Sequence, residues 1–369
     1  MGGVIAHEWI SRTGGSEKVL DAMVAAFPGA KVLTLWNDDA GRRYPGRDVQ
    51  ESWMARTPFR RHKALALPAM PMTWRDRDIA SVDWILASSH LFAHHVSLAG
   101  APDVPKYAYV YTPARYVWTP ELDTRGAGLA ARALAPALKH IDRKRAQEPD
   151  KIAAISNFVR ERIESSWLRD ADVIYPPVDV RNIQAGEPWA DTLEGRDRQI
   201  FESLPADFVL GASRFVPYKR LEQAIEIGEA VGLPVVLAGD GPDRRRLEAL
   251  AEDSATDVFF VGAPSDQLLY ALFERAVVYV FLAIEDFGIM PVESLALGTP
   301  VIVPDAGGAS ETVVDGLHGA HIHELSSPEA KRDAFNRATS VSAEACRIRA
   351  RDFDTERFDQ EITTWVANA

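Results

Sequence analysis

VVYVFLAIEDFGIMPVESLALGTPVIV, residues 277–303, contains two apolar runs with a different kind of segment between them. The runs 277–282 and 300–303 have the length and composition of buried strands, and 291–297 is predicted to be helical. Strands that are apolar throughout and alternate with helices indicate a parallel sheet that is covered on both faces. The stretch therefore predicts an α/β fold.

The same alternation extends outward from this stretch. In the second half, strands are expected at 208–213, 234–238 and 258–261, with helices at 221–230 and 244–251 and a further helix around Leu268, Leu269, Leu272, Phe273 and Ala276. In the first half, strands are expected at 4–6, 31–35, 84–87, 106–110, 152–155 and 173–177, with a helix from Ser16. We therefore expect two βα halves with a cleft between them and a polar linker over 181–205.

The composition excludes several classes of protein. The chain has 369 residues, of which 47% are hydrophobic and 25% charged, as in an ordinary globular protein. Its single cysteine, Cys346, excludes a disulfide framework and a cysteine-based zinc site. No apolar run reaches about 18 residues, and the first residues lack the basic and apolar regions of a signal peptide. A cytoplasmic location is therefore expected.

The net charge of −12 is unevenly distributed. Residues 1–180 carry 24 basic and 21 acidic side chains, a balance of +3, whereas residues 181–369 carry 17 and 32, a balance of −15. An acidic chain is a poor non-specific nucleic-acid binder, so no nucleic-acid partner is expected. A predicted basic amphipathic helix at 129–145 could contact an anionic membrane at its inner face, or present only a solvated surface.

Two glutamates, Glu285 and Glu293, flank the loop between the strand and the helix of the opening stretch. Pro291 is expected at the first helical position, where its missing N–H costs nothing. The N–H groups near Gly288 and Ile289 would then lie at the positive end of a helix, which favours a phosphate. The carboxylates could bind sugar hydroxyls. Alternatively, Glu293 in the first turn only complements the helix dipole, and Glu285 is solvated.

Each half has a further motif after its first predicted strand. Arg214 and Lys219 combine a guanidinium fork with a point charge, which suits a diphosphate, although a surface turn could carry the same residues. Gly14 and Gly15 precede the first helix, where glycine lets a backbone approach a phosphate closely. A plain turn with Ser16 as the helix N-cap explains the glycine pair equally well.

Together these motifs resemble the retaining glycosyltransferases of family 4. The resemblance covers most of the chain, from His7 and 14–17 through 151–159 and 174–179 to 285–293 and 307–311. It implies the GT-B fold, an α/β architecture of two Rossmann-like domains whose parallel sheets face a central cleft. The segments 216–220 and 285–289 are most similar to bacterial mannosyltransferases that use GDP-mannose.

The resemblance also implies a domain plan and a reaction. Residues 1–180 would form the acceptor domain and 181–352 the donor domain, and 353–369 would be a helix that packs back toward the N-terminal domain. The enzyme would move a hexose, with mannose the candidate, from a nucleotide-diphosphate sugar to an acceptor hydroxyl and retain the anomeric configuration. No cofactor or metal is implied, because arginine, lysine and a helix end replace the cation. The acceptor would be a glycan, a glycolipid or a small molecule.

The implied site residues fall into two groups. On the donor side, Arg214 and Lys219 would stabilise the departing diphosphate. Glu285 would hold sugar hydroxyls, and Glu293 would hold the ribose. Further donor contacts are implied for Gly14, Gly15, Gly262, Phe287, Gly288 and Ile289. On the acceptor or sugar side lie His7 and Tyr111, and because the family usually has histidine at the position of Tyr111, the identity of the sugar stays open.

Other interpretations of the same residues remain open. A nucleotide-sugar epimerase of the same fold would use Tyr111 and His7 as acid and base, and a non-catalytic module would bind the nucleotide sugar without turnover. The D-x-D string at 76–78 matches metal-dependent glycosyltransferases but does not follow a predicted strand, so no metal site is assigned to it. The pairs His94-His95 and His321-x-His323 lack further ligands at zinc spacing and are expected to be ordinary histidines.

Overall fold

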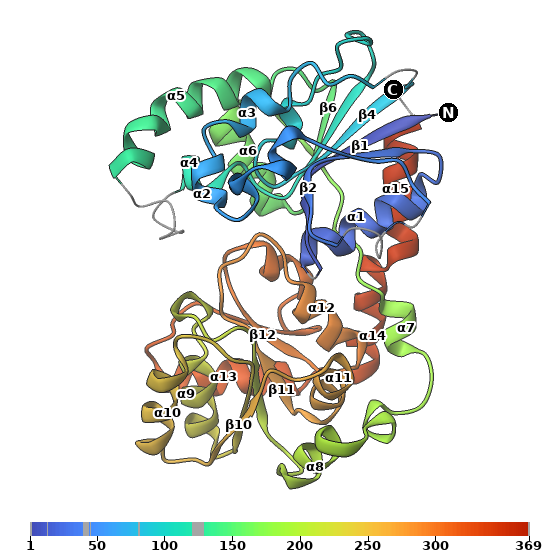
Figure 1. The fold of residues 1–369 in the computed structure, drawn as a ribbon. Coiled ribbons are helices and arrows are strands. Elements are labelled where there is room, and N and C mark those ends of the chain that lie inside the picture. The colour runs from blue at the N-terminus through green and yellow to red at the C-terminus, as the bar shows by residue number, and fades with distance from the viewer. Residues whose placement is uncertain are drawn as a thin grey trace. The chain divides into compact units, whose positions relative to one another are not determined.

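The computed structural model describes residues 2–12, 14–39, 44, 46–79, 82–119 and 129–367. Contacts divide the chain into two compact units, Met1–Pro177 with Glu356–Ala369, and Val178–Thr355 (Figure 1). The sequence analysis places the first boundary at residue 180 and the return to the N-terminal domain at residue 353. The roles of the two units as acceptor and donor domains stay predictions.

The N-terminal unit contains a seven-stranded parallel sheet with the order β3-β2-β1-β4-β5-β6-β7. Its strands are β1 (Gly3–Ile10), β2 (Lys31–Asn37), β3 (Val49–Glu51), β4 (Trp84–Ser89), β5 (Lys106–Val110), β6 (Lys151–Ala154) and β7 (Asp172–Val173). Its helices are α1 (Gly15–Ala26), α2 (Lys63–Ala66), α3 (Met70–Thr73), α4 (Arg115–Trp118), α5 (Leu129–Arg145), α6 (Asn157–Trp167) and nearly all of α15 (Thr355–Ala367).

Apolar side chains cover both faces of this sheet. On one face, the core includes Leu33, Leu35 and Ile85 from the strands with Met54, Met70, Trp74 and Leu138 from flanking segments. On the other face, Tyr107 and Tyr109 of β5 contact Trp365 and Phe358 of α15, with ring centroids 5.3 and 5.7 Å apart. Trp365 Nε1 also donates a hydrogen bond to Asp172 Oδ2 at 2.8 Å. These contacts fix the C-terminal helix on the N-terminal sheet.

The first strand is longer than predicted. The sequence favours only residues 4–6, because His7 and Glu8 interrupt the apolar run, but β1 continues to Ile10. Both polar side chains are fully buried and have partners. His7 Nδ1 lies 3.0 Å from Ser88 Oγ, and Glu8 accepts the backbone N–H groups of His90, Leu91 and Ala93. Polar residues can continue a buried strand when their atoms find such partners.

The C-terminal unit contains a six-stranded parallel sheet with the order β10-β9-β8-β11-β12-β13. Its strands are β8 (Val209–Ala212), β9 (Val235–Ala238), β10 (Val258–Gly262), β11 (Val278–Val280), β12 (Val301–Pro304) and β13 (Gly319–Ile322). Its longer helices are α9 (Glu222–Val231), α10 (Arg244–Glu252), α11 (Asp266–Arg275), α12 (Ile289–Ala296), α13 (Pro328–Thr339) and α14 (Ala343–Ala350). The parallel, Rossmann-like sheets predicted for both halves are confirmed.

Residues 181–205 are not the irregular linker that their polarity predicts. They lie in the C-terminal unit and contain most of α7 (Val180–Gln184), a 3-10 turn and α8 (Gly195–Ser203). The ring of Phe201 is buried, and the Arg275 guanidinium lies 3.3 Å from its centroid. Ser265 Oγ donates a hydrogen bond to Asp197 of the same helix. A few tertiary contacts therefore hold a mostly polar helix in place.

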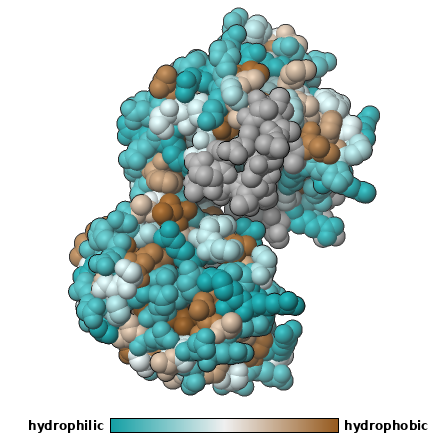
Figure 2. All heavy atoms as spheres, turned by 90° about the vertical axis from the view of Figure 1, so that its left-hand side faces the viewer, coloured by the Kyte–Doolittle hydropathy of each residue, from teal (hydrophilic) through white to brown (hydrophobic). Residues whose placement is uncertain are grey.

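No helix in the described part of the chain combines the length and the apolar character needed to cross a membrane. The face of the C-terminal unit drawn in Figure 2 is mostly hydrophilic, with apolar side chains scattered among polar ones. Scattered apolar residues are normal on a globular surface, so this face does not by itself indicate a partner.

Candidate functional site

Arg214, Lys219 and Glu285 follow two neighbouring strands of the C-terminal sheet. Arg214 and Lys219 come after β8, and Glu285 comes after β11, which pairs with β8 in parallel. The carboxyl ends of parallel strands meet at one edge of a sheet, and ligands of such sheets bind there. Lys219 Nζ lies 2.5 Å from Glu285 Oε1. The two sequence motifs therefore form one site.

The ion pair between Lys219 and Glu285 is partly shielded from water. The Lys219 side chain is 10% exposed and that of Glu285 is 26% exposed. Lys219 Nζ also lies 5.3 Å from the ring centroid of Phe281 and 5.5 Å from that of Tyr218, whose faces attract a cation. Shielding strengthens electrostatic interactions relative to bulk water. The ammonium group is therefore well placed for a strong contact with an anion.

Arg214 lies at the exposed side of the same strand end. Its Nη2 atom donates a long hydrogen bond to the Tyr218 hydroxyl at 3.4 Å. A guanidinium has five N–H donors in a planar fork, and this contact uses one of them. Arg214 and Lys219 therefore place two cations of different shape on the segment that follows β8.

Two glycines shape the loop that carries Glu285. The backbone N–H of Gly308 donates to the Glu285 carbonyl oxygen at 2.7 Å. A Cβ atom on Gly308 would lie 2.0 Å from the carbonyl oxygen of Asp286, and Gly307 has a φ of +98°. Position 308 therefore accepts only glycine unless the backbone moves. The sequence motif at 307–311 thus holds the Glu285 loop against the segment after β12.

Helix α12 starts at Ile289 instead of the predicted Pro291. Its N-cap is Gly288, so Pro291 occupies the third helical position, where the N–H would in any case lack a partner within the helix. The earlier start puts Glu293 beyond the first turn, where it is buried. The interpretation of Glu293 as a first-turn complement to the helix dipole is therefore wrong.

The other donor-side candidates lie at strand ends or against the core. Phe287 is buried, and its ring centroid lies 5.7 Å from that of Phe353. Gly262 ends β10 with a φ of +79°, a left-handed conformation that favours glycine. Its carbonyl oxygen accepts the N–H of Gly239 at 2.7 Å. The structure gives Gly262 a conformational role, and its contact with a base stays a prediction.

Gly14 and Gly15 lead into α1 of the N-terminal unit. The helix begins at Gly15 with Gly14 as its N-cap, so the interpretation of Ser16 as the N-cap is wrong. Ser16 Oγ instead donates to Glu17 Oε2 at 2.8 Å, and Glu17 Oε1 accepts the N–H of Ser11 at 3.1 Å. The buried Glu17 carboxylate therefore supports the glycine loop from inside.

His7 and Tyr111, predicted on the acceptor or sugar side, are joined by Ser88. Ser88 Oγ lies 3.0 Å from His7 Nδ1 and 2.9 Å from the Tyr111 hydroxyl, which donates to the Ser16 carbonyl oxygen at 3.2 Å. All of these side chains except that of Ser16 are buried. Burial, assisted by the charge of His90, lowers the pKa of His7 to about 4. His7 is therefore neutral near pH 7.

Glu8 is a fully buried carboxylate next to His7. It accepts the backbone N–H groups of Leu91 and Ala93 at 2.8 Å and that of His90 at 3.2 Å. Burial raises the pKa of Glu8, but the charges of His90 and His7 and these N–H groups outweigh it and lower the pKa overall. Ligand atoms of His7, Glu8 and His90 lie within 4.8 Å of one another. The Glu8 carboxylate already accepts hydrogen bonds from backbone N–H groups. These three residues are therefore better suited to holding the segment after β4 in place than to binding a metal.

A second buried carboxylate, Asp142 of α5, connects several segments. It accepts the indole N–H groups of Trp118 and Trp167 at 2.6 and 2.7 Å and lies 3.1 and 3.0 Å from Nε2 of His94 and His95. Burial raises the pKa of Asp142, but the charge of His94 and the histidine hydrogen bonds outweigh it and lower the pKa. His94 and His95 are buried and have polar partners, as expected for core histidines, and Asp142 reaches both from a helix that their sequence spacing does not indicate.

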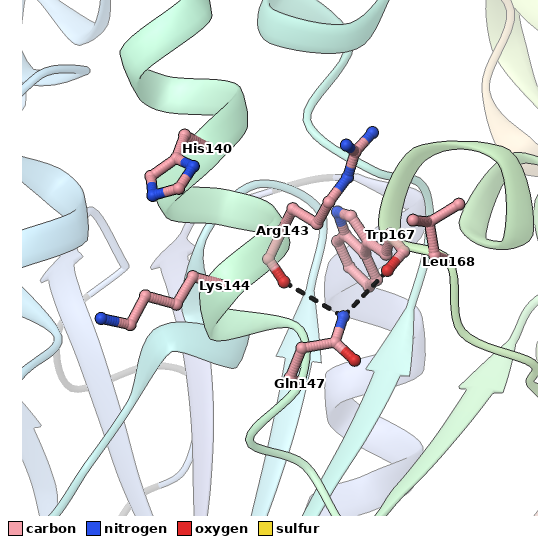
Figure 3. A pocket seen from close by; sticks show the side chains of 6 residues that line it. All are labelled: His140, Arg143, Lys144, Gln147, Trp167 and Leu168. Carbon is pink, nitrogen blue, oxygen red and sulfur yellow. Dashed lines mark hydrogen bonds between the residues drawn. The ribbon is translucent and has the colours of Figure 1, made fainter.

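A cavity of about 300 Å³ lies beside α5. Its lining combines basic and apolar side chains, namely His140, Arg143, Lys144, Gln147, Trp167 and Leu168 (Figure 3). Gln147 Nε2 donates to the carbonyl oxygens of Arg143 at 3.1 Å and Trp167 at 2.8 Å, which ties α5 to the end of α6. Leu168, the residue after α6, is an exposed apolar side chain. The basic helix predicted at 129–145 thus borders a largely apolar cavity that is lined in part by basic residues.

Comparison with known proteins identifies relatives for both halves of the chain. Residues 196–352 match the family model for glycosyl transferases group 1. A GDP-mannose-dependent alpha-(1-6)-phosphatidylinositol monomannoside mannosyltransferase of Mycobacterium tuberculosis is 28% identical over 49% of this chain and 50% of its own length. The enzyme of the same name from Mycolicibacterium smegmatis is 24% identical over 86% of this chain and 83% of its own length. The chain spans about half the length of the first of these relatives.

Solved structures resemble the chain along its whole length. HepE of Anabaena in complex with UDP has a TM-score of 0.73 at 18% identity. The alignment covers 100% of this chain and 100% of HepE. Sucrose-phosphate synthase from Thermosynechococcus elongatus has a TM-score of 0.70 at 16% identity. The alignment covers 100% of this chain and 99% of the synthase. At such low identity the likeness concerns the fold, which is the GT-B class with two Rossmann-like domains.

Proposed function

We propose that the protein transfers a hexose from a nucleotide-diphosphate sugar to an acceptor hydroxyl, with retention and without a metal ion. The match of residues 196–352 to the family model for glycosyl transferases group 1 and the similarity to mannosyltransferases support this proposal. Mannose is the candidate hexose. The observation that carries the proposal is the meeting of Lys219 with Glu285 at one edge of the C-terminal sheet. A cation for the diphosphate and a carboxylate for the sugar hydroxyls are the groups that such a donor requires.

Arg214 and Lys219 bind the diphosphate in this proposal. When the bond between the sugar and the phosphate breaks, negative charge collects on the leaving diphosphate. Preorganised cations in a shielded site stabilise that charge, as a divalent cation does in metal-dependent enzymes. The first N–H groups of α12, which begins at Ile289 after β11, favour an anion at the same edge of the sheet.

Glu285 holds the donor sugar in this proposal. Its Oε1 pairs with Lys219, so a diphosphate that binds Lys219 competes with the carboxylate for the ammonium group. The carboxylate oxygens then accept hydrogen bonds from sugar hydroxyls. Retention follows when the acceptor oxygen attacks on the face that the phosphate leaves. The acceptor proton passes to the departing phosphate oxygen, so the step needs no side-chain base.

The donor is tested by binding. Relatives support a nucleotide sugar but point to different bases: the mycobacterial relatives are named GDP-mannose-dependent, and HepE was solved with UDP and with UDP-glucose. A thermal-shift panel of GDP, UDP and their sugars separates these donors. A ligand at 100 times its dissociation constant stabilises the fold by about 2.7 kcal/mol, and the most stabilising compound identifies base and sugar together. If no nucleotide or nucleotide sugar stabilises the protein, the proposal is contradicted.

The acceptor is a glycan, a glycolipid or a small molecule, and we propose that α5 lies at an anionic membrane surface when the acceptor is lipid-linked. The basic residues Arg143 and Lys144 beside the apolar cavity and the exposed Leu168 support this orientation. Sedimentation with vesicles tests it: binding should require anionic lipid and weaken with salt and in Arg143→Ala/Lys144→Ala. Arg245→Ala on exposed α10 serves as the control. Equal binding to neutral vesicles would refute the electrostatic contact.

A further inference from the structure

The hydrogen bonds of His7, Ser88 and Tyr111 run in one direction. The Tyr111 hydroxyl has one proton and donates it to the Ser16 carbonyl oxygen at 3.2 Å. Its oxygen therefore accepts from Ser88 at 2.9 Å, and the Ser88 oxygen in turn accepts from His7 Nδ1 at 3.0 Å. Each proton in this series of hydrogen bonds is donated to another group of the protein. Neither Tyr111 nor Ser88 has a proton left for a ligand.

His7 is also turned away from solvent. Its side chain is fully buried, and its Nε2 is a buried atom without a hydrogen-bond partner among the described residues. The two residues that the sequence predicts on the sugar side are therefore enclosed. A ligand that reaches this part of the N-terminal unit must meet a neighbouring side chain first.

His90 is that neighbour. Its ring centroid lies 5.6 Å from that of His7, 6.1 Å from that of Tyr111 and 4.6 Å from that of Trp9, each time edge to face. The His90 side chain is 21% exposed, whereas His7 is fully buried. Its Nδ1 is buried, so the exposed part of the side chain lies elsewhere. His90 is thus a partly exposed side chain next to the buried pair.

Glu8 lies against His90. Glu8 Oε2 lies 3.2 Å from His90 Nδ1 and accepts the backbone N–H of the same residue. Nδ1 has no hydrogen-bond partner among the described residues, so Glu8 acts on the ring through its nearby charge and through the backbone bond. A ring nitrogen of histidine can accept a hydrogen bond from a hydroxyl group or donate one to its oxygen.

We propose that His90, oriented by the buried carboxylate of Glu8, is the residue of this cluster that contacts a hydroxyl of the bound sugar or acceptor. His7, Ser88 and Tyr111 form the rigid layer behind it and tie it to the start of α1. Glu8 is a positioning residue, because it acts through His90. The identity of the ligand as a sugar hydroxyl rests on the proposed function, whereas the exposure and orientation of His90 do not.

The test compares His90→Ala with His62→Ala, a substitution of an exposed histidine in the same unit. Loss of one neutral hydrogen bond should lower kcat/KM by about 3- to 10-fold in His90→Ala and leave His62→Ala unchanged. Added imidazole should restore part of the rate only in His90→Ala, because the deleted ring was open to solvent. A purely structural role would not give this rescue.

The outcomes separate the inference from the function on which it rests. Wild-type kcat/KM in His90→Ala, or a loss that imidazole does not relieve in a variant with wild-type melting temperature, would overturn the role of His90 alone. A wild-type protein that turns over no nucleotide sugar would overturn the proposed function and the sugar contact together. Glu8→Gln should lower kcat/KM, as His90→Ala does. If the losses of the two single variants add up in the double variant, Glu8 does not act through His90.

Discussion

Replacement of Lys219 by alanine removes the cation at the centre of the candidate donor site. Its Nζ lies 2.5 Å from Glu285 Oε1, and the side chain is only 10% exposed. The substitution deletes a charge-assisted hydrogen bond to the diphosphate, worth about 1.5–3 kcal/mol. If this contact is made mainly in the transition state, kcat should fall about 10- to 150-fold.

The same substitution should change stability far less. Without Lys219, Glu285 loses its counter-charge, but its side chain is 26% exposed and water screens part of the remaining charge. We therefore expect the free energy of unfolding to fall by about 1 kcal/mol or less. Release of nucleoside diphosphate under single-turnover conditions gives the rate, and urea denaturation gives the stability.

Lys331→Ala is the matched control. Lys331 of α13 is also a buried lysine in an ion pair within the same unit, with Glu226 of α9, and it lies outside the candidate site. It should lose stability and keep the wild-type kcat, whereas Lys219→Arg should recover part of the rate by restoring the charge. Wild-type kcat in Lys219→Ala, or an equal loss of kcat in folded Lys331→Ala, would refute the role of Lys219.

Three further predictions concern buried groups and the Glu285 loop. Asp142→Ala leaves two indoles and the His95 imidazole without their partner and removes the carboxylate beside His94. Urea denaturation should therefore show a loss of about 3–5 kcal/mol, and a loss below about 1 kcal/mol would contradict its connecting role. Burial lowers the pKa values of His7 and His95 from 6.5 to about 4. Because the unfolded chain then binds more protons between those pH values, stability should be complete above pH 6.5 and fall toward pH 4, by up to about 1.4 kcal/mol per pH unit for each histidine. A flat profile of denaturation midpoints would refute this burial effect. Gly308→Ala places a Cβ 2.0 Å from the carbonyl oxygen of Asp286, so calorimetry should show weaker donor binding and the fold should lose about 1–3 kcal/mol; unchanged affinity would separate this loop from the site.

The sequence predicts the sheets well because buried parallel strands are apolar along their whole length. The expected strands of the second half agree with β8 to β12 within a few residues at each end. The prediction fails at β1, where His7 and Glu8 continue a buried strand, and at α8, where the buried ring of Phe201 fixes a polar helix. In both places tertiary contacts override local composition, and a local pattern does not contain those contacts.

The candidate site is predictable only in part. Arg214, Lys219 and Glu285 stand out because they follow apolar strands, whose carboxyl ends meet at one edge of the sheet. Ser88 and Asp142 give no such signal, because their histidine partners lie 81 and 47 positions away. The start of α12 is also misplaced, since Pro291 suggests a first helical position while Gly288 forms the actual N-cap. Such errors arise where a site depends on how distant segments pack.

Time-resolved NMR of nucleotide-sugar turnover in the presence of EDTA tests the central claim most directly. The proposed reaction predicts that nucleoside diphosphate and transferred or released hexose form at the same rate. It also predicts that the first hexose product has the anomeric configuration of the donor and that EDTA does not slow the reaction. An inverted product or dependence on a divalent cation would contradict the claim, as would an altered nucleotide sugar without free diphosphate.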